Sequence, residues 1–309
     1  MRHWVSRMSA DVSICVAHLV RKKNGIAPLK QFLDSYHRHS PGVDHELLLI
    51  LKGFGAAKLD GDIENLLKPV SHSRLFIGDW GYDISAYFRA TKRFQYRYFC
   101  FLNSFSEILG DDWLLNLYRA INQENVGMVG ATGSYQGYHG DLESAPKALA
   151  TIKRPRWKQE VLKKMPYMKK LNLIRLRFLY PFFPNPHLRT NGFMIRRELM
   201  TSLRPQLTLT KSTAYRFEAG SRSMTNQVLS ARKAILVVDK NGNQYQIDDW
   251  VGSKTFWEGD QENLMISDNQ TRKYQASDFD MRELFSWFAW GHRKEQQSAD
   301  NIDAKTGPV

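Results

Sequence analysis

The stretch that decides the fold reads Asp79-Trp80-Gly81-Tyr82-Asp83-Ile84-Ser85-Ala86-Tyr87 and leads on to Tyr98-Phe99-Cys100-Phe101-Leu102-Asn103-Ser104. Gly81 permits a tight turn, and Asp83 is placed to cap a helix whose apolar residues follow at helical spacing. The second part is continuously apolar, as in a strand covered on both faces, and then turns polar. The stretch predicts a turn, a helix and a parallel strand, and in open α/β sheets the carboxyl end of such a strand is where ligands bind.

The remaining chain continues this alternation of strand and helix. Short apolar runs predict strands, and residues with helical spacing predict helices between them. The strands are expected at 12–17, 47–51, 74–77, 126–129, 191–195 and 234–238, and the helices around 29–36, at 60–67, from Asp111, at 197–203 and within 218–232. The turn at 239–242 predicts a hairpin. This order favours an α/β fold with a mostly parallel sheet flanked by helices.

Composition divides the chain into segments of different character. We expect an N-terminal arm (1–10), a first α/β half (11–133), a basic helical insertion (134–189), a second half (190–240), a small C-terminal subdomain (241–292) and a disordered polar tail (293–309). The aromatic residues near 285–290 have helical spacing and are expected in the core.

The formal charge of +13 is concentrated in one segment. Between Thr151 and Arg189, lysine and arginine are opposed by Glu160 alone. Such a segment requires lipid headgroups, nucleic acid, an anionic substrate or solvent around it. No apolar run approaches the length of a membrane span or signal peptide, so the chain is expected in the cytoplasm. Cys15 and Cys100 are expected to be inert buried thiols.

Several motifs follow one another over roughly residues 11–240. They are Ser13–Ala17, the strand ending at Asn103-Ser104, Asp111-Asp112-Trp113-Leu114, Thr190–Leu199 and Tyr215-Arg216-Phe217-Glu218. Gly81-Tyr82-Asp83-Ile84 is similar to the Gly-Arg-Asp-Val/Ile motif of rhamnan-synthesis glycosyltransferases. The chain therefore resembles the GT-A family, most of all its inverting enzymes with nucleotide-sugar donors.

The resemblance implies a Rossmann-like GT-A fold with the nucleotide sugar on 11–133 and the acceptor side on 190–240. It implies transfer of a hexosyl or deoxyhexosyl group to a cell-surface glycan or lipid-linked acceptor, in polysaccharide biosynthesis. As inverting transfer requires a base for the acceptor hydroxyl, the resemblance gives Glu218 this role. A helix cap, or an ion pair with Arg216 or Arg222, is the alternative account of Glu218.

The candidates for binding the donor lie near strand ends and in the Pro184–Asn191 segment, and all but Ala17 have polar side chains. They are Ala17, Lys52, Asp79, Asp83, Asn103, Ser104, His187, Arg189 and Asn191. Helix capping accounts equally well for Asp83, and a proline-fixed surface loop is the alternative for His187 and Arg189.

The family's Asp-x-Asp motif is absent, because Asn103-Ser104-Phe105-Ser106 stands in its place and Glu107 is the nearest carboxylate. Three alternatives follow: a metal-independent transferase, a weakly Mn- or Mg-dependent one that uses Glu107, or an inactive fold. We favour the first and expect no cofactor. Lys52, His187, Arg189 and Arg196 are then the cations available to the donor diphosphate.

Two other classes of protein compete with the transferase. A sequence pI of about 9.6 and aromatic residues among the cations are compatible with nucleic-acid binding, although no recognised nucleic-acid module occurs and no nucleic-acid partner is expected. A catalytically silent GT-A protein that binds a glycan or partner is the third class. The basic segment also suggests peripheral contact with an anionic inner membrane leaflet.

Overall fold

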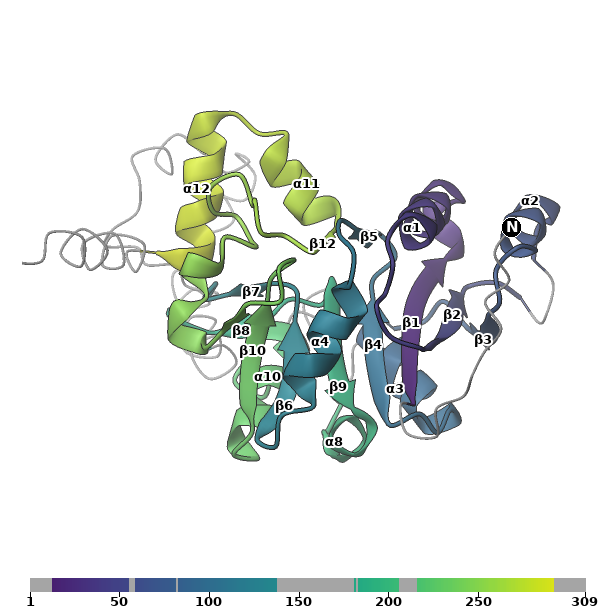
Figure 1. The fold of residues 1–309 in the computed structure, drawn as a ribbon, viewed down its shortest axis with the longest axis horizontal. Coiled ribbons are helices and arrows are strands. Elements are labelled where there is room, and N and C mark those ends of the chain that lie inside the picture. The colour runs from purple at the N-terminus through teal and green to yellow at the C-terminus, as the bar shows by residue number, and fades with distance from the viewer. Residues whose placement is uncertain are drawn as a thin grey trace, which may run out of the picture.

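A computed structural model describes residues 13–55, 59–81, 83–137, 181, 183–205 and 216–291. Its centre is an eight-stranded sheet with the order β11-β10-β6-β9-β4-β1-β2-β3 (Figure 1). The strands are β1 (Ile14–Arg21), β2 (Glu46–Lys52), β3 (Ser73–Ile77), β4 (Tyr98–Leu102), β6 (Val126–Gly130), β9 (Gly192–Arg196), β10 (Ala234–Val238) and β11 (Gln244–Tyr245).

Strand direction decides which residues meet at each edge of this sheet. β9 runs antiparallel to both of its neighbours, β4 and β6, and β11 runs antiparallel to β10, while the other neighbouring pairs are parallel. The parallel strands therefore share one carboxyl edge, and β9 starts at that edge. Residues just before β9 join the carboxyl ends, whereas Arg196 at its end lies at the opposite edge.

Helices cover both faces of the sheet. On one face lie α1 (Ala27–Arg38), α2 (Gly61–Leu67) and α4 (Trp113–Ile121), and on the other lie α3 (Asp83–Arg93), α8 (Arg197–Ser202) and α10 (Met224–Ser230). Successive side chains of β2 alternate between the two cores, with Leu49 facing α1 and Ile50 facing α3. Full burial of such side chains contributes about 1.5–3 kcal/mol each. The α/β class with a mostly parallel sheet is confirmed.

The C-terminal part packs against the carboxyl edge. Its elements are the 3₁₀ helices η2 (Ile247–Asp249) and η3 (Val251–Ser253), and the helices α11 (Asn269–Gln275) and α12 (Phe279–Trp290). The antiparallel pair of β5 (Glu107–Ile108) with β12 (Ile266–Ser267) connects it to the segment after β4. A second antiparallel pair, β7 (Gly133–Ser134) with β8 (His187–Leu188), lies next to α12, where the Tyr135 amide donates to the Ala289 carbonyl oxygen at 2.8 Å. Figure 1 shows α11 and α12 above this end of the sheet. Trp290 is fully buried and donates to the Phe256 carbonyl oxygen at 2.9 Å, as expected for a core residue.

Most predicted elements are confirmed, including α3, the bounds of β4 and β10, and the β10–β11 hairpin. The predicted end of the first strand is wrong, because β1 continues past Ala17 to Arg21 and is followed by the 3₁₀ helix η1 (Lys22–Asn24). It continues because His18 is buried against Phe32 of α1, with ring centroids 3.7 Å apart, so a polar residue does not end the strand.

Other predictions concern the start of α4, the basic insertion, the two cysteines and membrane-spanning helices. Asp111 does not cap the next helix, since α4 begins at Trp113 and Asp111 instead accepts a hydrogen bond from the Ser40 amide at 2.8 Å. The helix predicted within the basic insertion and the predicted tail lie outside the described residues. Cys15 and Cys100 are free and buried, as expected. Within the described ranges, no helix is both long and apolar enough to cross a bilayer.

Candidate active site

Two cations lie side by side at the carboxyl ends of β1 and β2. Arg21 and Lys52 are register partners in the parallel ladder, and the β3–α3 loop folds over them. Arg21 Nη2 lies 3.2 Å from Asp79 Oδ1, Arg21 Nη1 lies 3.9 Å from Asp83 Oδ1, and Lys52 Nζ donates to the Gly81 carbonyl oxygen. Gly53, at φ +81°, lets the chain pass close beneath Asp79. We call Arg21, Lys52, Asp79 and Asp83 the charged cluster.

The two cations of the charged cluster are matched by its two carboxylates, and burial and charge shift the pKa values of Lys52 and Asp83. Lys52 is fully buried, and burial lowers the pKa of Lys52 to about 8, with the nearby Arg21 charge acting in the same direction. Burial raises the pKa of Asp83, while Arg21 and Lys52 oppose this rise. The side chain of Asp83 is still 33% exposed and that of Asp79 is 51% exposed. The two acids are therefore the members of the cluster that solvent or a ligand can reach.

A second group forms around Glu218, which a helical turn at 216–219 presents. Thr190 donates to Glu218 Oε1 from its backbone amide and from its hydroxyl, both at 3.4 Å, and Arg189 Nε lies 4.0 Å from the same oxygen. Arg189 also donates to Gln136 Oε1 at 3.5 Å. After burial, the charges of Asp83 and Glu218 are the next causes that raise the pKa of Tyr87, so the two groups act on one region.

His187 is brought to the same region but carries no positive charge at neutral pH. It is fully buried, and its Nδ1 lies 2.9 Å from the Asn185 carbonyl oxygen. Burial lowers the pKa of His187 to about 4, and the charge of Arg189 acts in the same direction. The role of a cation for a diphosphate is therefore unsupported for His187.

Arg196 does not belong to the site. It donates to the Tyr98 hydroxyl at 2.9 Å and to the Ile121 carbonyl oxygen at 3.0 Å, at the opposite edge of the sheet. The expectation that Arg196 serves the donor diphosphate is wrong, because the antiparallel direction of β9 carries it away from the carboxyl edge.

Three other candidates lie in the framework of the fold. Ala17 is buried in the middle of β1, between Leu48 and Phe101 of the neighbouring strands. Asn191 accepts from the Thr132 hydroxyl at 2.6 Å and donates to the Ile266 carbonyl oxygen at 2.9 Å. Asn103 Oδ1 accepts from the Phe105 amide at 2.8 Å and so closes the turn after β4.

The residues after β4 do not fit a divalent metal. Asn103 Nδ2 donates to Asp268 Oδ2 at 3.2 Å, and Asp268 Oδ1 caps α11. Glu107 Oε2 accepts from Gln31 at 2.8 Å and from Arg272 at 3.2 Å, and Arg272 also donates to the Phe105 carbonyl oxygen at 3.1 Å. Among the residues that the structure describes, no three His, Cys, Asp or Glu side chains converge as metal ligands would.

The site also contains Arg21, Thr190 and Gln136, which the sequence analysis does not name as site residues. If the first strand is extended to its last apolar residue, Val20, the next residue at its carboxyl end is Arg21.

Buried polar atoms without a hydrogen-bond partner lie at the same edge. In the described ranges they are both ring nitrogens of His18, Arg21 Nε, Asp83 Oδ1, Tyr87 Oη, Ser104 Oγ, His187 Nε2 and, elsewhere, Trp113 Nε1. An unsatisfied buried group costs about 1–3 kcal/mol, so this edge is suited to a polar ligand or ordered water.

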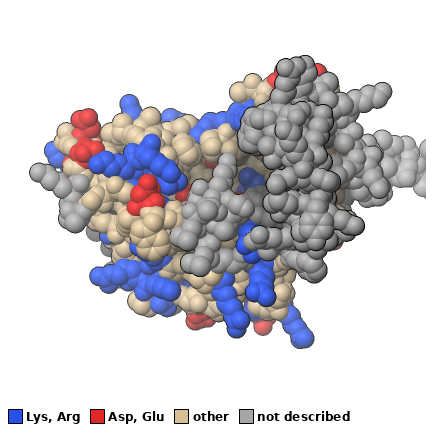
Figure 2. Space-filling view, turned by 180° about the vertical axis from the view of Figure 1, so that it is seen from behind, with Lys and Arg blue, Asp and Glu red and all other residues tan. Residues whose placement is uncertain are grey.

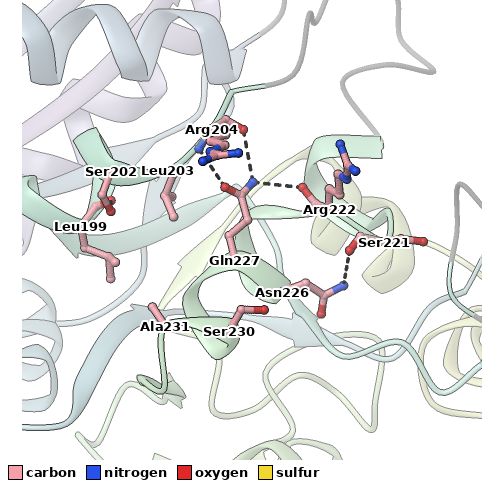
Figure 3. Close-up of a pocket in the computed structure, with 10 residues that line it drawn as sticks. All are labelled: Leu199, Ser202, Leu203, Arg204, Ser221, Arg222, Asn226, Gln227, Ser230 and Ala231. Carbon is pink, nitrogen blue, oxygen red and sulfur yellow. Dashed lines mark hydrogen bonds between the residues drawn. The ribbon is translucent and has the colours of Figure 1, made fainter.

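A separate pocket of about 370 Å³ lies between α8 and α10 and contains none of the candidate residues (Figure 3). Gln227 crosses it, accepting from the Arg204 amide at 2.8 Å and donating to the Arg222 carbonyl oxygen at 3.1 Å. The described residues that line it include Ser, Asn, Gln and Arg side chains but no Asp or Glu.

Comparison with known proteins returned solved structures only, since neither a protein-family model nor a curated protein matches the chain. One similar structure is the mannosyltransferase PcManGT from Pyrobaculum calidifontis in complex with GDP-Man and Mn²⁺, with a TM-score of 0.44, 10% identity, and coverage of 96% of this chain and 76% of that chain. The bifunctional WbbM gives a TM-score of 0.40, 11% identity, and coverage of 90% and 44%.

A third is glucosyl-3-phosphoglycerate synthase from Mycobacterium tuberculosis in complex with Mn²⁺, UDP and phosphoglyceric acid, with a TM-score of 0.33, 15% identity, and coverage of 63% and 59%. The chain thus spans less than two thirds of WbbM and of the synthase. At these scores the similarities carry no argument about activity. The chain's own sheet, parallel except at β9 and β11 and flanked by helices on both faces, is the architecture that the GT-A resemblance implies.

Proposed function

We propose that this chain is an inverting glycosyltransferase that moves a sugar from a nucleotide-sugar donor to a glycan or lipid-linked acceptor. One observation carries the proposal: a carboxylate, Glu218, is held by Arg189 and Thr190 at the carboxyl edge that also carries the charged cluster. A donor that bridges the two groups would place its diphosphate and sugar between them.

The charged cluster is suited to the nucleotide end of the donor. Asp79 and Asp83 accept hydrogen bonds from ribose hydroxyls or base N–H groups, since their side chains are partly exposed. Arg21 and Lys52, which lie behind the two acids, act together with Arg189 through their charge to make the site less negative toward the diphosphate, in place of a metal. Asn103 and Ser104 contribute the polar floor at the end of β4, where Ser104 Oγ has no partner.

Glu218 is suited to general-base chemistry. Its carboxylate takes the proton of the acceptor hydroxyl while that oxygen attacks the anomeric carbon and the bond to the diphosphate oxygen breaks. The electron pair of that bond leaves with the nucleoside diphosphate, and the configuration inverts. Arg189 and Thr190 orient the carboxylate.

The proposals about the acceptor and the location of the protein depend on the sequence alone. The basic segment 151–189 lies largely outside the described residues, and its cations would each contribute about 1 kcal/mol near an anionic leaflet. We propose a cytoplasmic protein that contacts the inner membrane face, where lipid-linked acceptors are displayed. Flotation with vesicles of phosphatidylglycerol and phosphatidylcholine tests this, and equal binding to both would remove the membrane contact.

Ligand-dependent thermal stability tests the donor site. GDP, GDP-mannose, UDP and UDP-glucose are the first probes, each measured with EDTA and with added Mn²⁺. A ligand that binds only the folded chain raises the unfolding midpoint, and we expect one nucleotide series to do so equally with EDTA. No shift in any condition would contradict a donor site.

The catalytically silent alternative is favoured by one observation, the pairing of Glu107 with Arg272 where the family has metal-binding carboxylates. A chain that binds a nucleotide sugar, yet neither transfers nor hydrolyses it with any acceptor, would support this alternative.

A further inference from the structure

The imidazole of His187 has a fixed proton position and one unused nitrogen. A carbonyl oxygen only accepts hydrogen bonds, so the 2.9 Å contact with the Asn185 oxygen places the proton on Nδ1. Nε2 therefore presents a lone pair, and it is buried without a hydrogen-bond partner. It requires a hydrogen-bond donor.

The neighbours of His187 belong to the proposed active site. Side chains two positions apart in an extended segment point to the same side, so His187 and Arg189 lie together, and Arg189 is paired with Glu218. Ser134 is the register partner of His187 on β7, and its hydroxyl accepts from the Gln136 amide at 3.1 Å. Ser134 is thus engaged with the backbone.

The chemistry of the donor decides which of its parts can satisfy Nε2. Diphosphate oxygens are ionised at neutral pH and only accept, so they repel a lone pair, whereas a sugar hydroxyl donates. We propose that His187 accepts a hydrogen bond from a hydroxyl of the donor's sugar and thereby helps to select that sugar. This inference rests on the proposed transferase function and deepens it.

Three variants separate this role from a structural one. His187→Phe keeps the ring and removes the acceptor, and His187→Gln keeps an acceptor oxygen at a similar reach. Ser134→Ala is the matched control, because it removes a buried polar group from the opposite strand. Calorimetry with UDP, UDP-glucose, GDP and GDP-mannose gives the affinity for each diphosphate and for its sugar-bearing form.

We expect the wild-type chain to bind one nucleotide sugar more tightly than its diphosphate. His187→Phe should weaken the nucleotide sugar about tenfold and leave the diphosphate unchanged, while His187→Gln and Ser134→Ala stay within about threefold of wild type. Donors that lack single sugar hydroxyls give a test without a variant. One such deoxy donor should bind the wild-type chain about tenfold more weakly.

Other results overturn the inference. His187→Phe weakens the sugar-bearing and sugar-free ligands equally in one such result, and weakens neither of them in another. Either result, or a series in which no deoxy donor loses affinity, would show that Nε2 bonds to a buried water or has only a structural role. If the wild-type chain gains no affinity from the sugar, the inference fails while the donor site stands. If it binds no nucleotide at all, the proposed function fails together with it.

Discussion

The two sides of the carboxyl edge differ in how completely their polar groups are satisfied. On the β1–β2–β3 side, Arg21 Nε and Asp83 Oδ1 of the charged cluster have no hydrogen-bond partner. On the β4 side, Asn103, Glu107, Asp268 and Arg272 bond to one another or to the backbone, and Ser104 Oγ is the one buried side-chain nitrogen or oxygen of residues 103–107 without a hydrogen-bond partner. The loop after β4, which would correspond to the metal-binding loop of the resembled family, therefore holds residues 266–272 against the sheet in this chain. The first side is left for a ligand.

Figure 2 shows a contrast in charge on another face. Lysine and arginine side chains follow the lower rim, on the side of α3 and α8, with few acids between them. Arg196 belongs to this end of the sheet, away from the charged cluster. The cations of the proposed donor site thus lie at strand ends, apart from those on this surface.

The largest expected effect comes from Glu218→Gln. The amide cannot take a proton, so transfer should slow about 100- to 10,000-fold while nucleotide affinity stays unchanged. Steady-state kinetics and calorimetry measure the two quantities. Glu198→Gln, on the exposed side of α8, is the control. Wild-type turnover in the Glu218→Gln variant would show that another group is the general base.

The next effect sharpens the comparison on the charged side. Arg21→Met removes the partner of Asp79 and Asp83, and we expect about a tenfold to hundredfold loss of nucleotide affinity. Arg93→Met, in the exposed last turn of α3, should bind as the wild type does. Unchanged calorimetric affinity in Arg21→Met would exclude the cluster as the nucleotide site.

Acid should weaken the fold through two histidines. Burial lowers the pKa of His18 to about 3 and that of His187 to about 4, below the ordinary value of 6.5. Because the unfolded chain then binds more protons, their contribution is complete above pH 6.5 and is lost as the pH falls toward 4. Near pH 4.5 we expect about 2.5 kcal/mol less stability per histidine.

Urea unfolding between pH 7 and 4.5 measures this loss. His18→Phe, which keeps the stack on Phe32, should flatten the dependence, because it removes one of the buried rings whose pKa is lowered. An equally steep dependence in His18→Phe would assign the acid sensitivity to other groups.

A smaller effect is expected on the β4 side. Arg272→Met leaves Glu107 and the Phe105 carbonyl oxygen without this donor, and we expect a loss of about 1–3 kcal/mol in the free energy of unfolding. Chemical denaturation measures it, with exposed Arg119→Met on α4 as control. Nucleotide affinity of the folded variant should remain that of the wild type.

The smallest effect is expected from chelation. With no carboxylate group suited to a metal in the described ranges, EDTA should change nucleotide affinity by less than about twofold. A requirement for Mn²⁺ would show that donor binding recruits carboxylates which the ligand-free chain keeps apart.

The sequence predicted the elements correctly where the local hydrophobic pattern agrees with the burial of the side chains in the folded protein. The apolar run of β4, the helical spacing after Asp83 and the turn at Gly81 predicted a strand, a helix and the edge on which Lys52, Asp79 and Asp83 meet. Periodicity reports which side chains are buried, and here the tertiary structure buries the same ones.

The rest depended on contacts between distant segments. β1 reaches Arg21 because α1 buries His18, and that contact is not visible in the strand's own pattern. The antiparallel direction of β9 cannot be read from an alternation of strands and helices, and this misplaced Arg196. Glu107 and Arg272 are 165 positions apart, so their pairing could not be foreseen.

The most direct test compares Arg21→Met and Arg272→Met for binding of the nucleotide that stabilises the wild-type chain. Calorimetry in the presence of EDTA should show a loss of about tenfold or more for Arg21→Met and none for Arg272→Met. The reverse order would contradict the account, because it would place the nucleotide on the β4 side of the edge and return that loop to the role it has in the resembled family.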